Sequence, residues 1–120
     1  MFTFNFEKLD VWQEAIQLAS LVYKITRNFP EHERFGLTNQ MRRAAVSISS
    51  NIVEGSSRVS WTDFARFVEI ATGSLFEVVS QAKVSLNQQF LSKSEYEEIA
   101  NAAEKECRML SGLRWSLAQH

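Results

Sequence analysis

The chain has 120 residues, of which 45% are apolar and 22% are charged. This balance excludes a disordered chain, which has fewer apolar residues and a larger net charge. A net charge of −1 excludes a strongly basic nucleic-acid-binding domain, and one proline with four glycines excludes an all-β chain, which needs frequent turn residues. The composition therefore indicates one folded domain, residues 1–120, built from long helices.

The first helix is predicted over residues 10–27, because polar residues recur there every three or four positions. Asp10 is its predicted N-cap, since a short acceptor side chain binds the free N–H groups of a first helical turn. Apolar residues, including Trp12 and Ile16, fill a wider arc than burial of one face requires. Pro30 disfavours helical geometry in the residue before it, so the helix ends ahead of it.

A second helix is predicted over residues 38–55, beginning near Leu37 or Thr38 with Thr38 as its cap. Its apolar face is accompanied by many small residues, which permit close approach of a neighbouring helix. Gly55 and the two serines that follow it mark the C-terminal end.

The third helix is predicted over residues 61–89, opened by a capping box of Ser60 and Asp63. Its polar stripe is again narrow, and Phe64 and Phe67 belong to the broad apolar arc.

The fourth helix is predicted over residues 93–118, opened by a more regular capping box of Ser92 and Glu95. Its apolar residues step at close to heptad spacing, so it is amphipathic on one side only. The connections between the four helices are short, which favours antiparallel neighbours. The predicted fold is all-α, an antiparallel up-down-up-down four-helix bundle.

The surplus of apolar surface on the first and third helices has two interpretations. The residues stay exposed, as many apolar atoms do on any protein, or they form a subunit interface, as larger apolar patches do. The excess lies on two long helices with regular polar stripes, so we favour the interface. The candidate interface residues are Trp12, Ile16, Phe64 and Phe67.

No pattern of residues indicates an enzyme. The single cysteine, Cys107, has no histidine near it in the sequence, and two histidines cannot by themselves form a metal site. The carboxylate pair Glu104 and Glu106 is typical of a solvated helix face. Gly73 and Ser74 are interpreted as a close-packing position, because no partner base accompanies the serine. We expect no catalytic residue, no cofactor, no bound metal and no small-molecule substrate.

The location of the protein is also predicted from what the sequence lacks. No apolar run approaches the roughly 20 residues that span a bilayer, and the first ten residues do not resemble a signal peptide. A single cysteine suits a reducing compartment. We expect a cytoplasmic protein with no membrane partner.

A polar stripe on the second helix consists of Arg43, Ser47, Asn51 and Glu54, followed by Arg58 at the same spacing. The simpler interpretation is a ladder of ion pairs and hydrogen bonds that fixes the helix register, with Glu54 four residues before Arg58 in the favourable orientation. The alternative is a polar groove for a phosphate or a peptide.

Residues 34–66 form the one basic stretch, with five arginines against two acidic residues. Arginine side chains contact phosphates, and salt weakens each such contact. The candidate nucleic-acid contacts are Arg34, Arg42, Arg43, Arg58 and Arg66.

Several segments together resemble a bacterial family, the four helix bundle proteins, also called 23S rRNA intervening-sequence proteins. The segments are LDVWQ (9–13), ERFGLT (33–38), QMRRAA (40–45), NIVEGS (51–56) and GSLFE (73–77). They cover most of the chain in the family's order.

The resemblance implies a four-helix bundle that assembles into a homo-oligomeric ring, commonly a pentamer. Some related proteins are accessory subunits of diversity-generating retroelements, with basic surfaces that bind a reverse transcriptase and nucleic acid. Others are encoded within insertions in 23S rRNA genes. The resemblance implies no enzymatic activity.

Two functional hypotheses follow. In the first, the chain is a non-enzymatic oligomeric scaffold that binds a macromolecule, with RNA, including 23S rRNA, as the candidate partner of the basic stretch. In the second, it is an adaptor that binds a partner protein, such as a reverse transcriptase or another nucleic-acid enzyme, without touching nucleic acid.

Overall fold

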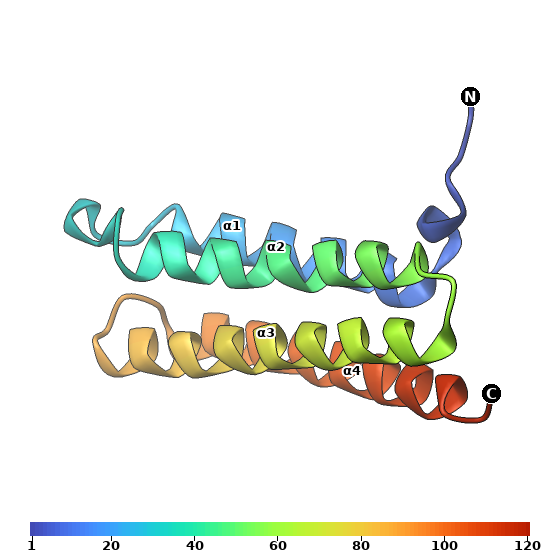
Figure 1. The fold of residues 1–120 in the computed structure, drawn as a ribbon. Helices are drawn as coiled ribbons and strands as arrows, with labels where there is room; N and C mark the ends of the chain where they lie inside the picture. The colour runs from blue at the N-terminus through green and yellow to red at the C-terminus, as the bar shows by residue number, and fades with distance from the viewer.

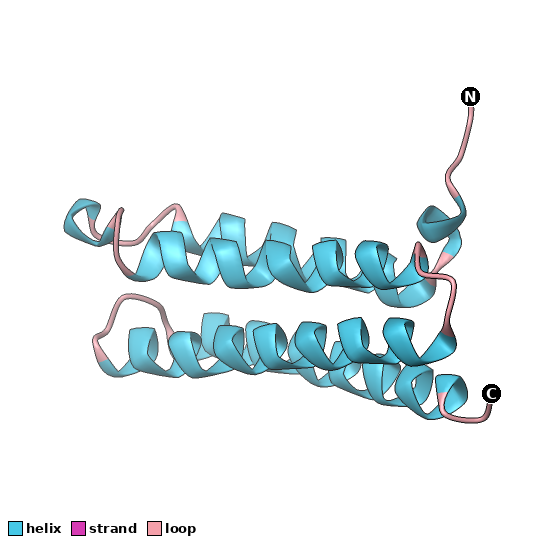
Figure 2. Cartoon of the chain, viewed as in Figure 1, coloured by secondary structure: helices cyan, strands magenta, loops and turns pink.

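The computed structural model describes residues 1–120, and every regular element in it is helical (Figure 2). The elements are η1 (Asn5–Lys8), α1 (Asp10–Thr26), η2 (Glu31–Glu33), α2 (Leu37–Ser56), α3 (Trp61–Asn87) and α4 (Lys93–Leu117). The prediction of an all-α fold with four long helices is confirmed. None of the helices combines the length and the hydrophobicity that crossing a bilayer requires.

The four long helices form two layers (Figure 1). One layer holds α1 and α2, the other holds α3 and α4, and α2 packs on α3 while α1 packs on α4. The α1–α2 and α3–α4 connections lie at one end of the molecule, and the α2–α3 connection lies at the other end with both termini (Figure 1). The outer surfaces of α1 and α2 therefore lie on the same side of the molecule.

The core consists of 21 buried apolar residues from the inner faces of all four helices and their connections. Leu18, Met41, Ile48, Leu75 and Ile99 are among the largest side chains with almost no exposed surface. Burying a side chain of this size contributes about 1.5–3 kcal/mol relative to leaving it in water. The helical spacing of apolar residues thus determines which faces meet.

Ser60 and Ser92 are the N-caps of α3 and α4, as the sequence predicts. Ser60 Oγ accepts a hydrogen bond from the Asp63 N–H at 3.0 Å, although Asp63 does not return one. The capping box at Ser92 is complete: its Oγ accepts from the Glu95 N–H at 3.0 Å, and Glu95 Oε1 accepts from the Ser92 N–H at 2.8 Å. Glutamate has the extra methylene that the return bond needs.

The predictions of Asp10 and Thr38 as caps are wrong. Asp10 is already the first residue of α1, and the capping position before it is Leu9, whose side chain cannot accept a hydrogen bond. Thr38 lies inside α2 and is buried. The first N–H group of α2 is instead capped from the preceding turn: Glu33 Oε1 accepts a hydrogen bond from the Leu37 N–H at 3.1 Å.

The two glycines inside α2 and α3 have opposite surroundings. A Cβ added to Gly55 would lie 2.8 Å from Phe64 Cδ1 and 2.8 Å from Phe67 Cβ, so the missing side chain lets α2 and α3 approach closely. A Cβ on Gly73 would meet nothing within 4 Å. The predicted close packing is therefore wrong at Gly73, whereas its neighbour Ser74 is buried.

Candidate nucleic-acid interface

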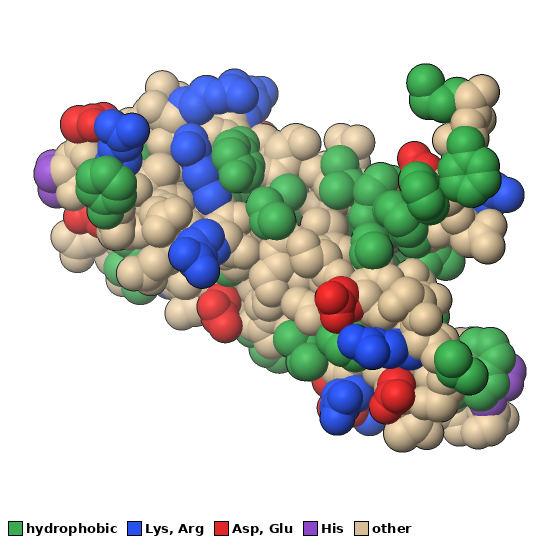
Figure 3. All heavy atoms as spheres, turned by 45° about the horizontal axis from the view of Figure 1, so that its top comes forward, with side chains coloured by type: hydrophobic (Ala, Val, Ile, Leu, Met, Phe, Trp, Pro, Cys, Tyr) green, Lys and Arg blue, Asp and Glu red, His purple; other side chains and the backbone are tan.

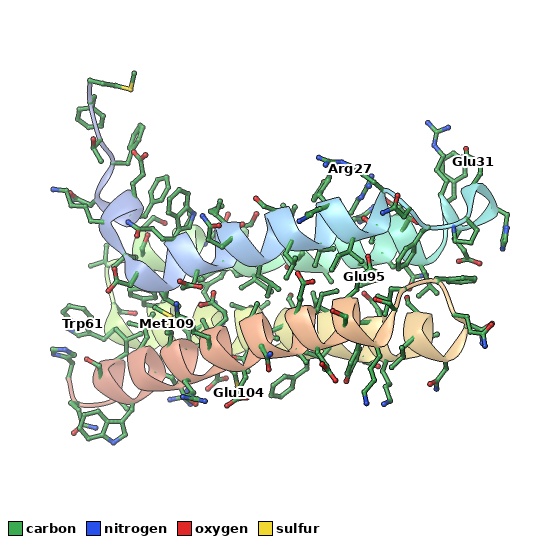
Figure 4. The ribbon with its side chains drawn as sticks, turned by 180° about the vertical axis from the view of Figure 1, so that it is seen from behind. Arg27, Glu31, Trp61, Glu95, Glu104 and Met109 are labelled. Atoms are coloured by element: carbon green, nitrogen blue, oxygen red, sulfur yellow. The ribbon has the colours of Figure 1, made fainter.

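Four basic residues belong to the end of the α1–α2 layer that carries the α1–α2 connection. We call Lys24, Arg27, Arg42 and Arg43 the basic cluster; the first two come from the last turn of α1 and its C-cap, the others from the second turn of α2. Figure 3 shows Lys and Arg side chains gathered over this end of the layer, and Figure 4 shows Arg27 on the outer side of α1. Arg42 is half-buried and the other three are exposed.

Arg42 is held in place by α1. Its Nε donates to Thr26 Oγ1 at 2.9 Å, and its Cζ lies 4.6 Å from the centre of the Tyr23 ring. Thr26 is buried and its hydroxyl donates to the Val22 carbonyl at 2.7 Å, so the acceptor is itself fixed. The guanidinium is therefore presented at the surface in one orientation, with donors left over for a ligand.

None of the four residues of the basic cluster has an acidic partner. Of the 13 Lys and Arg side chains, those that form ion pairs with carboxylates are Arg34, Arg58, Lys105, Arg108 and Arg114. No member of the basic cluster has a carboxylate oxygen within 4.0 Å. Its positive charge is thus available to an anionic ligand.

Two polar pockets flank α2 beside the basic cluster. The α1–α2 pocket has a volume of about 600 Å³, and Tyr23, Asn39, Val46 and Ser50 line it. The α2–α3 pocket has a volume of about 380 Å³, and Gln40, Ala44, Ser74, Glu77 and Gln81 line it. Arg43 and Ser47 line both pockets. The two pockets therefore meet over α2 at a cation and a hydroxyl group.

The structure separates the five arginines that the sequence grouped together. Arg42 and Arg43 belong to the basic cluster, and Arg34 pairs with Glu31 at 3.6 Å near the same end. Arg58 and Arg66 lie at the other end of the bundle, because the 14 residues of α2 after Arg42 span about 21 Å. Arg66 has no carboxylate within 4.0 Å, and Arg58 pairs with Glu54 at 3.3 Å.

Lys24 and Arg27 are not among the nucleic-acid contacts predicted from the sequence. They are distant from Arg42 in the chain, and only the packing of α1 against α2 brings them close. A signal was present: both end the first helix, and antiparallel neighbours joined by a short connection place that end beside the start of the second helix.

The polar stripe on α2 is partly an internal ladder. Asn51 Nδ2 donates to the Ser47 carbonyl at 2.8 Å and to Ser47 Oγ at 3.0 Å. Ser47 Oγ lies 2.9 Å from Ser74 Oγ, which ties α2 to α3. The predicted pair between Glu54 and Arg58 is present. Arg43 forms none of these bonds, so the stripe contains structural residues and one free cation.

The candidate interface residues are only half-buried in the single chain. Trp12 contacts Phe6 edge to face with 5.2 Å between ring centres, while Phe64 and Phe67 pack against Gly55 of their own chain. More exposed apolar side chains lie elsewhere, including Phe76 on α3, which is 59% exposed. Their role in assembly stays a prediction.

An apolar pocket of about 440 Å³ lies between α3 and α4 on the opposite layer. Leu75, Phe76 and Val79 line it from α3, and Ala103 and Cys107 line it from α4. Cys107 is half-buried there as a free thiol. Nowhere in the structure do three or more His, Cys, Asp or Glu side chains gather closely enough to hold a metal ion.

Glu106 corrects the prediction of a solvated carboxylate pair on α4. Glu104 is exposed, but Glu106 has no exposed surface, and neither of its carboxylate oxygens has a hydrogen-bond partner. Burial, and secondly the nearby Glu14 carboxylate, raise the pKa of Glu106 to about 8. The side chain is therefore protonated in the folded protein at neutral pH.

Comparison with known proteins supports the sequence resemblance. The family model for the 23S rRNA-intervening sequence protein matches residues 7–112, which is most of the chain. The chain belongs to this family. The match includes the four long helices up to Gly112, and so it includes the basic cluster and both polar pockets.

A solved structure shows that other proteins share the fold. A protein of unknown function from the S23 ribosomal protein family of Bacteroides thetaiotaomicron superimposes with a TM-score of 0.77 at 24% sequence identity. The match covers 86% of this chain and 96% of that one. No functionally curated protein matches the chain.

Proposed function

We propose that this protein is a non-enzymatic, self-assembling scaffold that binds nucleic acid through the basic cluster. The observation that carries the proposal is that four cations share one end of the α1–α2 layer and have no carboxylate partner. Lys and Arg side chains that contact phosphates release bound counterions, and this release supplies most of the non-specific affinity for nucleic acid. The family description names 23S rRNA, so RNA is the first nucleic acid to test.

Self-assembly is part of the proposal because one chain offers few phosphate contacts. The net charge of −1 gives little long-range attraction. Assembly of several copies repeats the basic cluster, and simultaneous contacts raise the overall affinity without any new kind of contact. The exposed apolar side chains Ile70, Phe76 and Val84 of α3 support self-association. The ring size to test first is the pentamer that the resemblance implies.

The order of the helices belongs to the same proposal. We infer an antiparallel, up-down-up-down bundle, supported by connections that alternate between the two ends of the molecule (Figure 1). This order places the last turn of α1 beside the first turns of α2, and so assembles the basic cluster from two separate segments.

Removal of two cluster cations tests the RNA proposal. We expect Arg42→Ala/Arg43→Ala to lower the affinity for a fluorescein-labelled single-stranded RNA about tenfold or more at low salt. The slope of log affinity against log salt between about 50 and 200 mM should flatten by about 1.4, since each phosphate contact on a single strand contributes about 0.7. Fluorescence anisotropy measures both quantities.

The matched control removes two cations from α4. Arg108→Ala/Arg114→Ala changes the net charge by the same amount but acts on arginines paired with Glu104 and Glu69. Its affinity and salt slope should stay near those of the native protein, and equal losses in the two variants would contradict the proposal. Lys24→Ala/Arg27→Ala, which removes no contact to Thr26, repeats the test if loss of Arg42 unfolds the chain.

The apolar α3–α4 pocket favours a second function, that of an adaptor for a partner protein. Phe76 is exposed at its edge, and five further lining residues are apolar. An amphipathic helix of a partner fits such a surface. Capture of a partner that survives nuclease treatment and is lost in Phe76→Ser would support this function, and capture that requires RNA would contradict it.

A further inference from the structure

The chemistry of the α2–α3 pocket differs from that of a simple phosphate site. Its polar lining groups are the amides of Gln40 and Gln81, the hydroxyls of Ser47 and Ser74, the carboxylate of Glu77 and the guanidinium of Arg43. Amides and hydroxyls both donate and accept hydrogen bonds. They suit a neutral group with donors and acceptors on its edge better than they suit a phosphate alone.

One hydrogen-bonding group in this pocket is unused. Gln81 Oε1 has no solvent-accessible surface and no hydrogen-bond partner. A buried acceptor without a partner is uncommon and costs free energy. Gln40, by contrast, is exposed at the rim of the pocket, four residues before Ala44 and one turn from Arg43. The pocket thus contains an amide oxygen without a hydrogen-bond partner and, at Arg43, a cation without an ion-pair partner.

The size and position of the pocket decide which form of nucleic acid it fits. Its volume of about 380 Å³ is within the range of small-ligand pockets. A base inside a duplex keeps its pairing edge occupied and its faces stacked, so it cannot enter a recess in a helical surface unless it is first extruded. Unpaired bases in single strands are free to enter, and side chains then read their edges.

We propose that the α2–α3 pocket takes one unpaired base of a single-stranded RNA, whose adjacent phosphate contacts Arg43. This inference rests on the proposed function, because the basic cluster supplies the backbone contacts. Glutamine amides pair with the donor and acceptor groups of a base edge, and the two glutamines provide such groups on both sides of the recess, Gln40 from α2 and Gln81 from α3. The protein then prefers single-stranded RNA to a duplex of the same sequence.

The test compares single-stranded RNA with its duplex in a variant of the pocket. Gln40→Ala/Gln81→Leu removes both amides and no charge. The leucine replaces a group whose oxygen has no partner, so the fold should keep its stability. We expect the affinity for the single strand to fall about tenfold, since two hydrogen bonds are lost. The affinity for the duplex and the salt slope should stay unchanged.

The matched control is Gln17→Ala/Gln88→Leu, which makes the same two changes at exposed positions outside the pocket. It should bind both RNAs like the native protein. The inference is overturned if the pocket variant loses single strand and duplex equally, or loses neither. It is also overturned if polyglutamate of equal charge competes as well as single-stranded RNA. Native protein that binds neither RNA at low salt overturns the proposed function as well.

Discussion

Each layer of the bundle contains ionisable groups without a partner, and two such sites lie in opposite environments. In the α1–α2 layer the basic cluster stands at the surface without carboxylate partners, whereas the cations Lys105, Arg108 and Arg114 of α4 are all paired. In the α3–α4 layer the carboxyl group of Glu106 is buried and has no hydrogen-bond partner. An exposed unpaired charge costs the fold little because water solvates it, but a buried carboxylate must stay neutral. The charge of the basic cluster is therefore available to a ligand, whereas the buried carboxyl group of Glu106 affects the stability of the fold.

The largest expected effect concerns Glu106. In the folded protein the pKa of Glu106 is about 8, whereas in the unfolded chain it is near the ordinary value of 4.5. The folded state therefore binds more protons between these values, and its stability must fall as the pH rises through that window and then level off. The total change reaches about 5 kcal/mol, since one pKa unit corresponds to about 1.4 kcal/mol.

Urea denaturation at a series of pH values measures this dependence. Glu106→Gln should remove most of the decline above pH 5, because the amide cannot ionise. Glu97→Gln, at an exposed position on the same helix, is the control and should keep the decline of the native protein. A native protein whose stability is the same at pH 6 and pH 9 would show that Glu106 reaches water or a partner group.

The second-largest expected effect on stability concerns Gly55, where α2 packs against α3. Gly55→Ala places a Cβ within 2.8 Å of two phenylalanine side chains, so α2 and α3 must separate or the rings must move. We expect a loss of about 1–3 kcal/mol in the free energy of unfolding, measured by thermal or urea denaturation. An unchanged stability would mean that the two layers are less closely packed than the structure shows.

Gly73→Ala is the control for Gly55→Ala, because a Cβ at position 73 meets no other atom within 4 Å. It should raise the stability of the single chain by about 0.5–1 kcal/mol, because alanine favours the helix and meets no neighbour. The same variant also reports on assembly. If chromatography with light scattering shows that it dissociates an oligomer of the native protein, α3 contacts another copy at Gly73.

The smallest effects on stability belong to the surface charges. Arg43→Ala breaks no ion pair and Arg108→Ala breaks an exposed one, so each should change the free energy of unfolding by less than about 0.5 kcal/mol. Thermal denaturation of the two variants tests this. A larger loss in Arg43→Ala would show that this arginine stabilises the fold and would weaken its assignment to binding.

The sequence predicted those features that depend on spacing along one helix. Helical periodicity located the four long helices, and serine followed by glutamate three residues later located the start of α4. The spacing also indicated the Glu54–Arg58 pair. These features need only local geometry, which is the same in every helix.

Features that depend on packing between helices were harder to predict. The basic cluster combines residues from two segments, so a stretch of sequence from Arg34 to Arg66 included arginines from both ends of the bundle. Glu106 was assigned to the solvated face by its residue type. Its position indicates otherwise, because it continues the apolar row of Ile99, Ala103 and Leu110 at spacings of four and three. For Glu106, the position along the helix therefore indicates burial better than the residue type does.

The central claim is that the basic cluster, and not the overall charge, binds RNA. The most direct measurement compares two charge reversals, Arg43→Glu and Arg108→Glu, by RNA anisotropy at about 100 mM salt. Both change the net charge equally, but only the first places a carboxylate in the basic cluster. The account predicts that Arg43→Glu abolishes binding while Arg108→Glu leaves it close to that of the native protein. Equal losses in the two variants would contradict it.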